Sequence, residues 1–157
     1  MQPPDDPFNL DRFVQAQRDS YRQALAELES GQKRSHWIWF VFPQLAGLGR
    51  SSTAVWYSIN SIEEARAYLA HPILGSRLRE CTETVLGLTT TDAERVFGYI
   101  DAVKFRSSMT LFARLTPPDS PFERALVKFF AGIPDEGSLR ILATMSEGEA
   151  GTEATPR

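Results

Sequence analysis

The stretch NLDRFVQAQRDSYRQALAELESG, residues 9–31, decides the fold class. Its apolar side chains recur at intervals of three and four residues, which places them along one side of a helix. These side chains are Leu10, Phe13, Val14, Tyr21, Ala24, Leu25 and Leu28. Asn9 is the expected N-cap, and Gly31 is the expected end of this single helix.

Paired capping signals indicate further helices. Ser61 with Glu64, and Thr91 with Glu94, have the spacing of a capping box, in which two side chains bond free amides at a helix start. The predicted helices after the first cover a short segment beyond 61, 72–88, a short segment ending near 98, 100–115, 121–131 and 138–144.

The clearest helix start is at Ser120. A capping hydroxyl, a proline at the first helical position and a glutamate at the third follow one another as Ser120, Pro121 and Glu123. Two apolar stretches are ambiguous: residues 37–42 fit a buried strand or one buried helical turn, and residues 54–57 fit a short strand. We therefore predict an all-α, compact, single-domain helical array with at most a minor strand pair.

Composition narrows the class of protein. The chain of 157 residues is 42% hydrophobic and 24% charged, which is typical of one globular domain. A net charge of −3 supplies no general basic field for nucleic acid or an acidic membrane. Cys81 is the only cysteine, and residues 1–6 do not resemble a signal peptide. We expect a soluble, cytoplasmic protein without membrane contact.

Both ends of the chain are poor in residues that a core would bury. Residues 1–8 carry three prolines and two aspartates, and residues 146–157 hold no side chain larger than alanine to bury. We predict a disordered arm at 1–8, one helical domain at 9–145 and a disordered tail at 146–157.

An acid, a base and a hydroxyl lie on the apolar side of the helix predicted at 100–115. At 100° per residue, Asp101, Lys104 and Ser108 share an arc with apolar side chains. A buried charge is costly unless it is paired, and Asp101 and Lys104 have the spacing for a pair. Two interpretations stay open: a cleft wall that binds an anion, or a structural ion pair at the edge of the core.

The loop GLGRSST, residues 47–53, and the two histidines are weaker candidates. Glycine amides with Arg50 and hydroxyls form phosphate cradles, but the loop matches no established motif, so a glycine turn is favoured. His71 is expected to cap a helix, and His36 to be a hydrogen-bonded core histidine or part of a pocket. Cys81 lies on an apolar stripe and is expected in the core. We predict no metal site and no cofactor.

Several stretches together resemble a known family. They are KRSHWIWFVFPQL (33–45) followed by Gly47-Leu48-Gly49 and Ser51, HPILGSRL (71–78), FGYID (97–101) with Lys104 and SSMTLF (107–112), and DRFVQAQ (11–17). In this order they resemble the domain of unknown function 1810 family, often labelled calpastatin, over residues 9–143. The resemblance implies a compact, mainly helical protein of bacterial cytoplasmic type, unlike a disordered protease inhibitor, and it supplies no function.

The motif positions of that family coincide with the polar candidates, which favours one shared site. We predict a pocket for a phosphorylated or nucleotide-like ligand, such as an ADP-ribose-type compound, with or without hydrolysis. Asp101 is the expected acid or base and Lys104 the expected anion contact. The other predicted ligand-binding residues are His36, Trp37, Trp39, Gln44, Ser51, Arg77, Ser107 and Ser108.

Two other functions are compatible with the sequence. In a non-enzymatic interaction module, the dense aromatics would be core and the Asp101–Lys104 pair would be structural. Nucleic-acid binding is disfavoured by the net charge, although a local basic patch is conceivable. Its members would be Arg12, Arg18, Arg22, Lys33 and Arg34.

Overall fold

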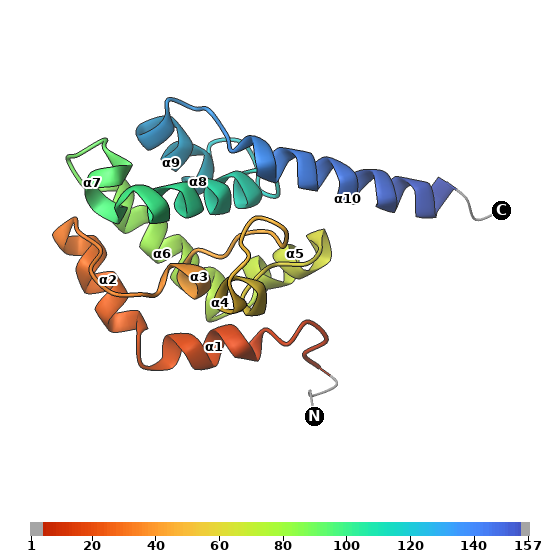
Figure 1. Ribbon diagram of the computed structural model, residues 1–157, viewed down its shortest axis with the longest axis horizontal. Helices are drawn as coiled ribbons and strands as arrows, with labels where there is room; N and C mark the ends of the chain where they lie inside the picture. The colour runs from red at the N-terminus through yellow and green to blue at the C-terminus, as the bar shows by residue number, and fades with distance from the viewer. Residues whose placement is uncertain (1–4, 155–157) are drawn as a thin grey trace.

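Ten helices make up the regular structure of the computed structural model, which describes the backbone of residues 5–154 and the side chains of residues 5–145 (Figure 1). They are α1 (Asp11–Arg18), α2 (Tyr21–Ser30), α3 (Ile38–Val41), α4 (Ser52–Trp56), α5 (Ile62–Ala70), α6 (Leu74–Leu86), α7 (Ala93–Phe97), α8 (Tyr99–Ala113), α9 (Pro121–Phe130) and α10 (Glu136–Ala154). Within the described residues, extended pairing is limited to one parallel bridge between Leu45 and Ile59, so the all-α prediction is confirmed.

Residues 9–31 form two helices, so the prediction of a single helix was wrong. The chain leaves the first helix at Asp19 and enters the second after Ser20, two residue types whose side chains compete with helical backbone bonds. The break lets α1 pack on α3 while α2 packs on α6. The apolar stripe therefore continues through the break although the helix does not.

The start of α1 also differs from the prediction. Asn9 has a φ of 52° and does not cap the helix with its side chain. Instead the carboxylate of Asp6 accepts hydrogen bonds from the amides of Leu10 at 2.7 Å and Asp11 at 3.0 Å. The cap thus comes from a residue of the predicted disordered arm.

Both ambiguous apolar stretches are short helices. Residues 38–41 form the single buried turn α3, which was one of the two alternatives for residues 37–42. Residues 54–57, a candidate strand, lie mostly within α4, so that strand prediction was wrong. Ser51 begins α4 because its hydroxyl accepts a hydrogen bond from the Ala54 amide at 3.1 Å.

The capping signals were largely correct. The Ser61 hydroxyl accepts from the Glu64 amide at 3.0 Å, and the Ser120 hydroxyl accepts from the Glu123 amide at 3.2 Å. In both cases, however, the glutamate bonds the amide before the cap residue: Glu64 at Asn60 and Glu123 at Asp119. Local spacing therefore located these helix starts to within one residue.

Two other helix starts illustrate where spacing is less decisive. Asp92 caps α7 by accepting from the Glu94 amide at 3.0 Å, so the prediction that Thr91 is the cap was wrong. An aspartate competes well for this position because its charge also favours the positive end of the helix. At α6, the Nδ1 atom of His71 accepts from the Leu74 amide at 3.2 Å, which confirms its capping role.

Helix α8 lies at the centre of the packing. It packs against α7, α9 and α10, and also against α3 and α5 (Figure 1). Its Phe105 ring is fully buried and lies 4.4 Å from the ring of Phe97, 5.0 Å from that of Phe42 and 6.1 Å from that of Phe129, measured between centroids. Residues on the buried side of α8 are therefore surrounded by helices drawn from the whole chain.

The ends of the chain are more structured than the composition predicts where the structure describes them. Residues 1–4 of the predicted arm lie outside the described residues, while Phe8 packs against the core. Helix α10 begins before the expected position and continues to Ala154, past the expected end at Thr144 and into the predicted tail. Residues 155–157 lie outside the described range. No helix within residues 5–154 has the length and apolar character required to cross a bilayer.

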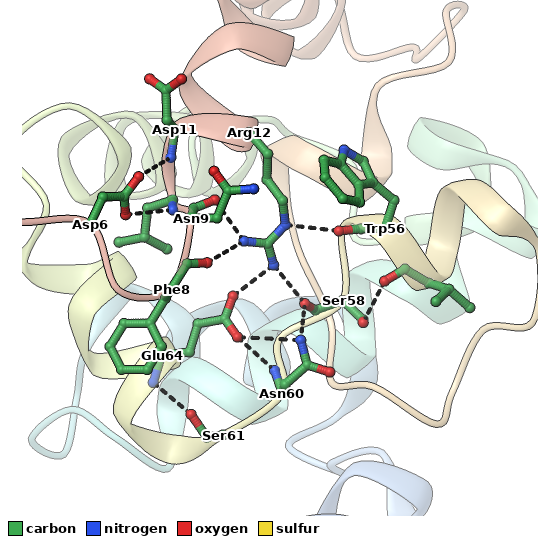
Figure 2. Close-up of polar contacts among 12 residues, drawn as sticks. Asp6, Phe8, Asn9, Asp11, Arg12, Trp56, Ser58, Asn60, Ser61 and Glu64 are labelled. Atoms are coloured by element: carbon green, nitrogen blue, oxygen red, sulfur yellow. Dashed lines mark hydrogen bonds and ion pairs between the residues drawn. The ribbon is translucent and has the colours of Figure 1, made fainter. Parts of the chain in front are cut away.

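A buried arginine joins α1 to α5 and to the segment between α4 and α5 (Figure 2). The Arg12 guanidinium donates to Glu64 Oε2 at 2.7 Å and to the carbonyl oxygens of Trp56, Ser58 and Phe8 at 2.8, 2.9 and 2.7 Å. The Arg12 and Glu64 side chains are 7% and 4% exposed. Such a fully bonded guanidinium holds backbone segments together and is not free to contact an outside ligand.

Candidate functional site

A buried carboxylate organises the loop that leads into α3. Glu27 of α2 accepts hydrogen bonds from the amides of Arg34 at 2.7 Å and Ser35 at 2.9 Å, from the Ser35 hydroxyl, and from the indole of Trp37 at 2.9 Å. Burial by itself raises the pKa of the Glu27 carboxyl, but these hydrogen bonds outweigh it and lower the pKa from 4.5 to about 2. The loop is therefore fixed relative to α2.

The same loop places Lys33 against α8. Lys33 Nζ lies 2.6 Å from Asp101 Oδ2, and it also donates to the Ser35 carbonyl oxygen. The predicted partner Lys104 lies 3.5 Å from the other oxygen, Asp101 Oδ1. The Lys33 side chain is 4% exposed, whereas those of Asp101 and Lys104 are 21% and 20% exposed. Asp101 is thus held chiefly by Lys33, and Lys104 is the more accessible cation.

The two tryptophans of the predicted site have different surroundings. Trp37 is 1% exposed, and the ammonium of Lys33 lies 5.1 Å from the centre of its ring. Trp39 is only partly buried, and the ammonium of Lys104 lies 5.7 Å from the centre of its ring. Trp37 is therefore a core residue, while Trp39 and Lys104 together form a partly open cation–aromatic pair.

Two serines follow on the same helix. The Ser107 hydroxyl donates back to the Val103 carbonyl oxygen at 3.1 Å, a common way to satisfy a helical serine. The Ser108 hydroxyl is fully buried, and it has no hydrogen-bond partner among the described residues. Because a buried hydroxyl normally has a partner, Ser108 is the unsatisfied polar group of this face of α8.

The loop at residues 47–53 has a structural explanation at each glycine. Gly47 has a φ of 101°, a left-handed conformation that favours glycine. A Cβ atom at Gly49 would lie 2.5 Å from the Ala54 Cβ and 3.2 Å from Gln44 Nε2. The loop therefore packs closely between α4 and the buried Gln44, and the Ser51 hydroxyl serves as the α4 cap.

Arg77 and His36 lie apart from the Asp101 group in their contacts. Arg77 of α6 donates to Gln17 Oε1 at 3.3 Å, and its guanidinium lies 4.6 Å from the centre of the Tyr21 ring. No contact between described side chains joins Arg77 to Asp101 or Lys104. His36 is exposed, so the alternative of a core histidine was wrong.

Cys81 is a core residue, as its position on an apolar stripe predicted. It is fully buried, and burial raises the pKa of its thiol to about 12. A thiol with that pKa is poorly suited to nucleophilic chemistry at neutral pH. Across the described residues, no group of three or more His, Cys, Asp or Glu side chains is arranged to hold a metal ion.

The structure thus brings together Trp39, Asp101 and Lys104 of the predicted site and adds Lys33, which the sequence indicated only as a member of a possible basic patch. The sequence carried one usable signal for Lys33, since it begins the stretch that resembles the family motif. Glu27 was missed as well, although it occurs between Ala24 and Leu28 on an apolar stripe. A carboxylate at such a position indicates a buried acceptor.

The arrangement has a clear chemical consequence. Both Asp101 oxygens face lysine ammonium groups, so Asp101 can accept a proton from a substrate only if Lys104 moves aside. Lys104 itself has one long ion-pair contact and a partly exposed side chain, which leaves donors for an anionic group. In this geometry binding of an anion requires less rearrangement than acid–base chemistry.

Comparisons with known proteins identify a relative of the same fold and a family. The chain is 51% identical to the conserved hypothetical protein Rv1873 from Mycobacterium tuberculosis, whose crystal structure it matches with a TM-score of 0.86 over 88% of this chain and 99% of that one. No curated protein matches the chain. The model of a family of proteins of unknown function, DUF1810, matches residues 7–142. The chain therefore belongs to the DUF1810 family.

Proposed function

We propose that this protein binds a small phosphorylated or nucleotide-like molecule at the contact between α3 and α8. ADP-ribose is one example of this class of ligand. The observation that carries the proposal is the pairing of the partly exposed Lys104 ammonium with the partly buried Trp39 ring. An ammonium group attracts phosphate oxygens, and an indole ring offers a flat surface on which a base can stack.

The charges around Lys104 favour the same ligand class. Asp101 and the two lysines carry a net positive charge, which attracts an anion more than a neutral ligand. Ser108 follows Lys104 by one helical turn, and its buried hydroxyl has no hydrogen-bond partner among the described residues. A buried water molecule beside it would satisfy that hydroxyl.

The contacts of Asp101 favour ligand binding over hydrolysis as the primary function. Asp101 is bonded to Lys33 at 2.6 Å, so its first role is to hold the loop before α3 against α8. If the ligand draws Lys104 towards its phosphate, Asp101 Oδ1 becomes free to accept a proton. Hydrolysis would then depend on ligand binding, and an activity assay should follow a confirmed ligand.

The first experiment is a thermal-shift panel of nucleotides, ADP-ribose, sugar phosphates and inorganic phosphate. A ligand at about 100 times its Kd adds roughly 2.7 kcal/mol, which raises the melting temperature by a few degrees for a domain of this size. We expect Lys104→Ala and Trp39→Ala to lose the shift. Arg18→Ala, which removes an exposed cation on α1, should keep it.

Either of two results would contradict the proposal: a ligand shift that survives both substitutions, or no shift from any member of the panel. The second result would favour the alternative function, a protein-interaction module. One observation supports that alternative, because Tyr99, Ile100 and Val103 of α8 are 66%, 69% and 48% exposed. Nucleic-acid binding has less support, since Arg12 and Lys33 are occupied by Glu64 and Asp101.

A further inference from the structure

A cavity of about 860 Å³ opens between α5, α8, α9 and α10, and none of the predicted site residues lines it. Its wall includes Ile62 of α5, Leu126 of α9 and Leu142 of α10. A volume of this size lies within the range of small-molecule pockets. The cavity is therefore a second candidate site, independent of the surface that carries Lys104 and Trp39.

Two arginines that line this cavity have guanidinium groups with no bonding partner among the described residues. Arg66 comes from α5 and Arg114 from the C-terminal cap of α8. Neither guanidinium makes an ion pair or a hydrogen bond with any described residue. By contrast, Arg12 and Arg124 are each bonded to a carboxylate. Two guanidinium groups beside one cavity, without partners in the described part of the chain, are suited to a carboxylate or phosphate, which a guanidinium binds in a forked, two-bond geometry.

The other polar side chains of the described wall, those of Thr110, Thr116 and Glu123, each already make a hydrogen bond. The Thr110 hydroxyl donates to the Arg106 carbonyl oxygen at 2.8 Å and accepts from the Asp135 amide at 2.9 Å. Glu123 also lines the cavity, and its Oε1 atom accepts from the Asp119 amide at 2.7 Å. Among the described lining residues, one carboxylate is present with two guanidinium groups, so this part of the lining is positively charged. Among the described lining side chains, the two arginines are therefore the donors with bonding capacity for an anionic ligand.

The rest of the cavity wall indicates which kind of non-ionic group the ligand carries. Apart from the polar residues, two prolines and a glycine, it is formed by aliphatic side chains, and no aromatic side chain among the described residues lines the cavity. The larger ones are Ile62, Leu115, Leu126, Val127, Leu139 and Leu142. A wall of this kind favours a flexible apolar chain through burial of apolar surface. It offers no ring on which a nucleobase can stack, in contrast to Trp39.

We infer that this cavity binds an aliphatic organic anion, with its acidic group at Arg66 and Arg114 and its apolar chain along α9 and α10. The shared chemistry is one anionic head on an alkyl or acyl chain. A carboxylate head and a phosphate head both fit this description, and the test distinguishes them. The inference does not depend on the proposed function, because the two sites have no residue in common.

The test is a titration of the isotopically labelled protein with octanoate and with octyl phosphate, followed by amide chemical shifts and kept below the micelle-forming concentration. Octanol, which has the same chain without the charge, is the control ligand. We expect saturable chemical-shift changes at residues of the cavity. The ligand with the lower Kd identifies which acidic head group, carboxylate or phosphate, the cavity prefers. Octanol should bind at least tenfold more weakly, because a charge-assisted hydrogen bond contributes roughly 1.5–3 kcal/mol.

The substitutions are conservative, so that a loss of ligand binding does not arise from a loss of folding. Arg66→Met and Arg114→Met retain the apolar stems of exposed side chains, and we expect each to raise the Kd roughly tenfold or more. Arg95→Met, on α7 and outside the cavity lining, should bind as the wild type does. Lys104→Ala should also keep octanoate binding even if it abolishes nucleotide binding.

Three outcomes would overturn the inference. They are equal binding of octanol and octanoate, an unchanged Kd in the Arg66→Met/Arg114→Met double variant, and shifts confined to residues outside the cavity. Circular dichroism melting of each variant verifies that it is folded, so a loss of binding reports on the site. A blank nucleotide panel with positive octanoate binding would separate failure of the proposed function from failure of this inference.

Discussion

The carboxylate of Glu27 accepts hydrogen bonds from three residues of the loop that leads into α3. In the folded protein the pKa of its carboxyl is lowered from 4.5 to about 2, since five donors outweigh the effect of burial. A lowered pKa stabilises the fold above the unfolded value, and that stability disappears as the pH falls from about 4.5 towards 2. The contribution at neutral pH is about 3 kcal/mol, at roughly 1.4 kcal/mol per pKa unit.

We therefore expect Glu27→Gln to lower the free energy of unfolding at pH 7 and to have a much smaller effect near pH 2. Urea denaturation at a series of pH values measures both quantities. Glu29→Gln, two residues further along α2 and exposed, is the matched control and should have little effect at any pH. A Glu27→Gln effect that stays constant from pH 7 to pH 2 would show that the carboxylate charge does not contribute.

The sequence predicted only some of the residues that surround Asp101. The spacing within α8 correctly indicated that Asp101 and Lys104 pair, because both belong to one helix. The stronger partner of Asp101, Lys33, comes from a distant loop that no spacing rule reaches. Local periodicity predicts neighbours along a helix, whereas partners from other elements depend on packing.

At the scale of elements, the contact between α5 and α6 depends on one glycine. A Cβ atom at Gly75 would lie 2.1 Å from the Leu69 carbonyl oxygen, so a side chain there pushes the start of α6 away from the end of α5. The contact is with backbone, which cannot turn aside as a flexible side chain does. Gly75 is therefore needed for the close approach of two helices.

We expect Gly75→Ala to destabilise the protein by about 1–3 kcal/mol, as overpacking typically does. Thermal or urea unfolding measures the change. Gly87→Ala is the control, because a Cβ there would meet the Thr84 carbonyl oxygen at an ordinary 3.5 Å and φ at Gly87 is −77°. Equal stability of the two variants would contradict the steric argument.

The accuracy of the predicted helix starts depended on how many side chains compete to cap the same amides. The starts of α5 and α9 were predicted correctly, since a serine three residues before a glutamate occurs at each. The starts of α1 and α7 were not, because Asp6 and Asp92 displaced the expected caps. A carboxylate nearby in the chain competes for the same amides, and the direction of the incoming chain decides which one binds.

At the scale of the whole molecule, the Arg12–Glu64 pair connects α1 to α5 across 52 residues (Figure 2). Removal of the arginine leaves the buried Glu64 carboxylate without its cation. We expect Arg12→Met to cost about 3–5 kcal/mol, and Arg12→Met/Glu64→Gln to recover part of that loss, since the isolated charge is then absent. Urea unfolding of the two single variants and the double variant measures the coupling energy.

The surface pair of Arg124 and Glu83 provides a control of similar geometry. Its two charged groups are 3.0 Å apart, but their side chains are 43% and 52% exposed. Water already solvates these groups, so Arg124→Met should cost less than about 1 kcal/mol. A cost for Arg12→Met as small as this, or no recovery in the double variant, would mean that the buried network does not hold α1 and α5 together.

The amino-acid sequence by itself determined the all-α class, most helix positions and the family, because helical periodicity, capping and motif order are local properties of the chain. Only the tertiary structure decided the Lys33–Asp101 and Arg12–Glu64 pairs and the cavity beside Arg66 and Arg114. Each of these brings together groups from separate helices. Their meeting depends on how all the helices share one core, which no short stretch of sequence encodes alone.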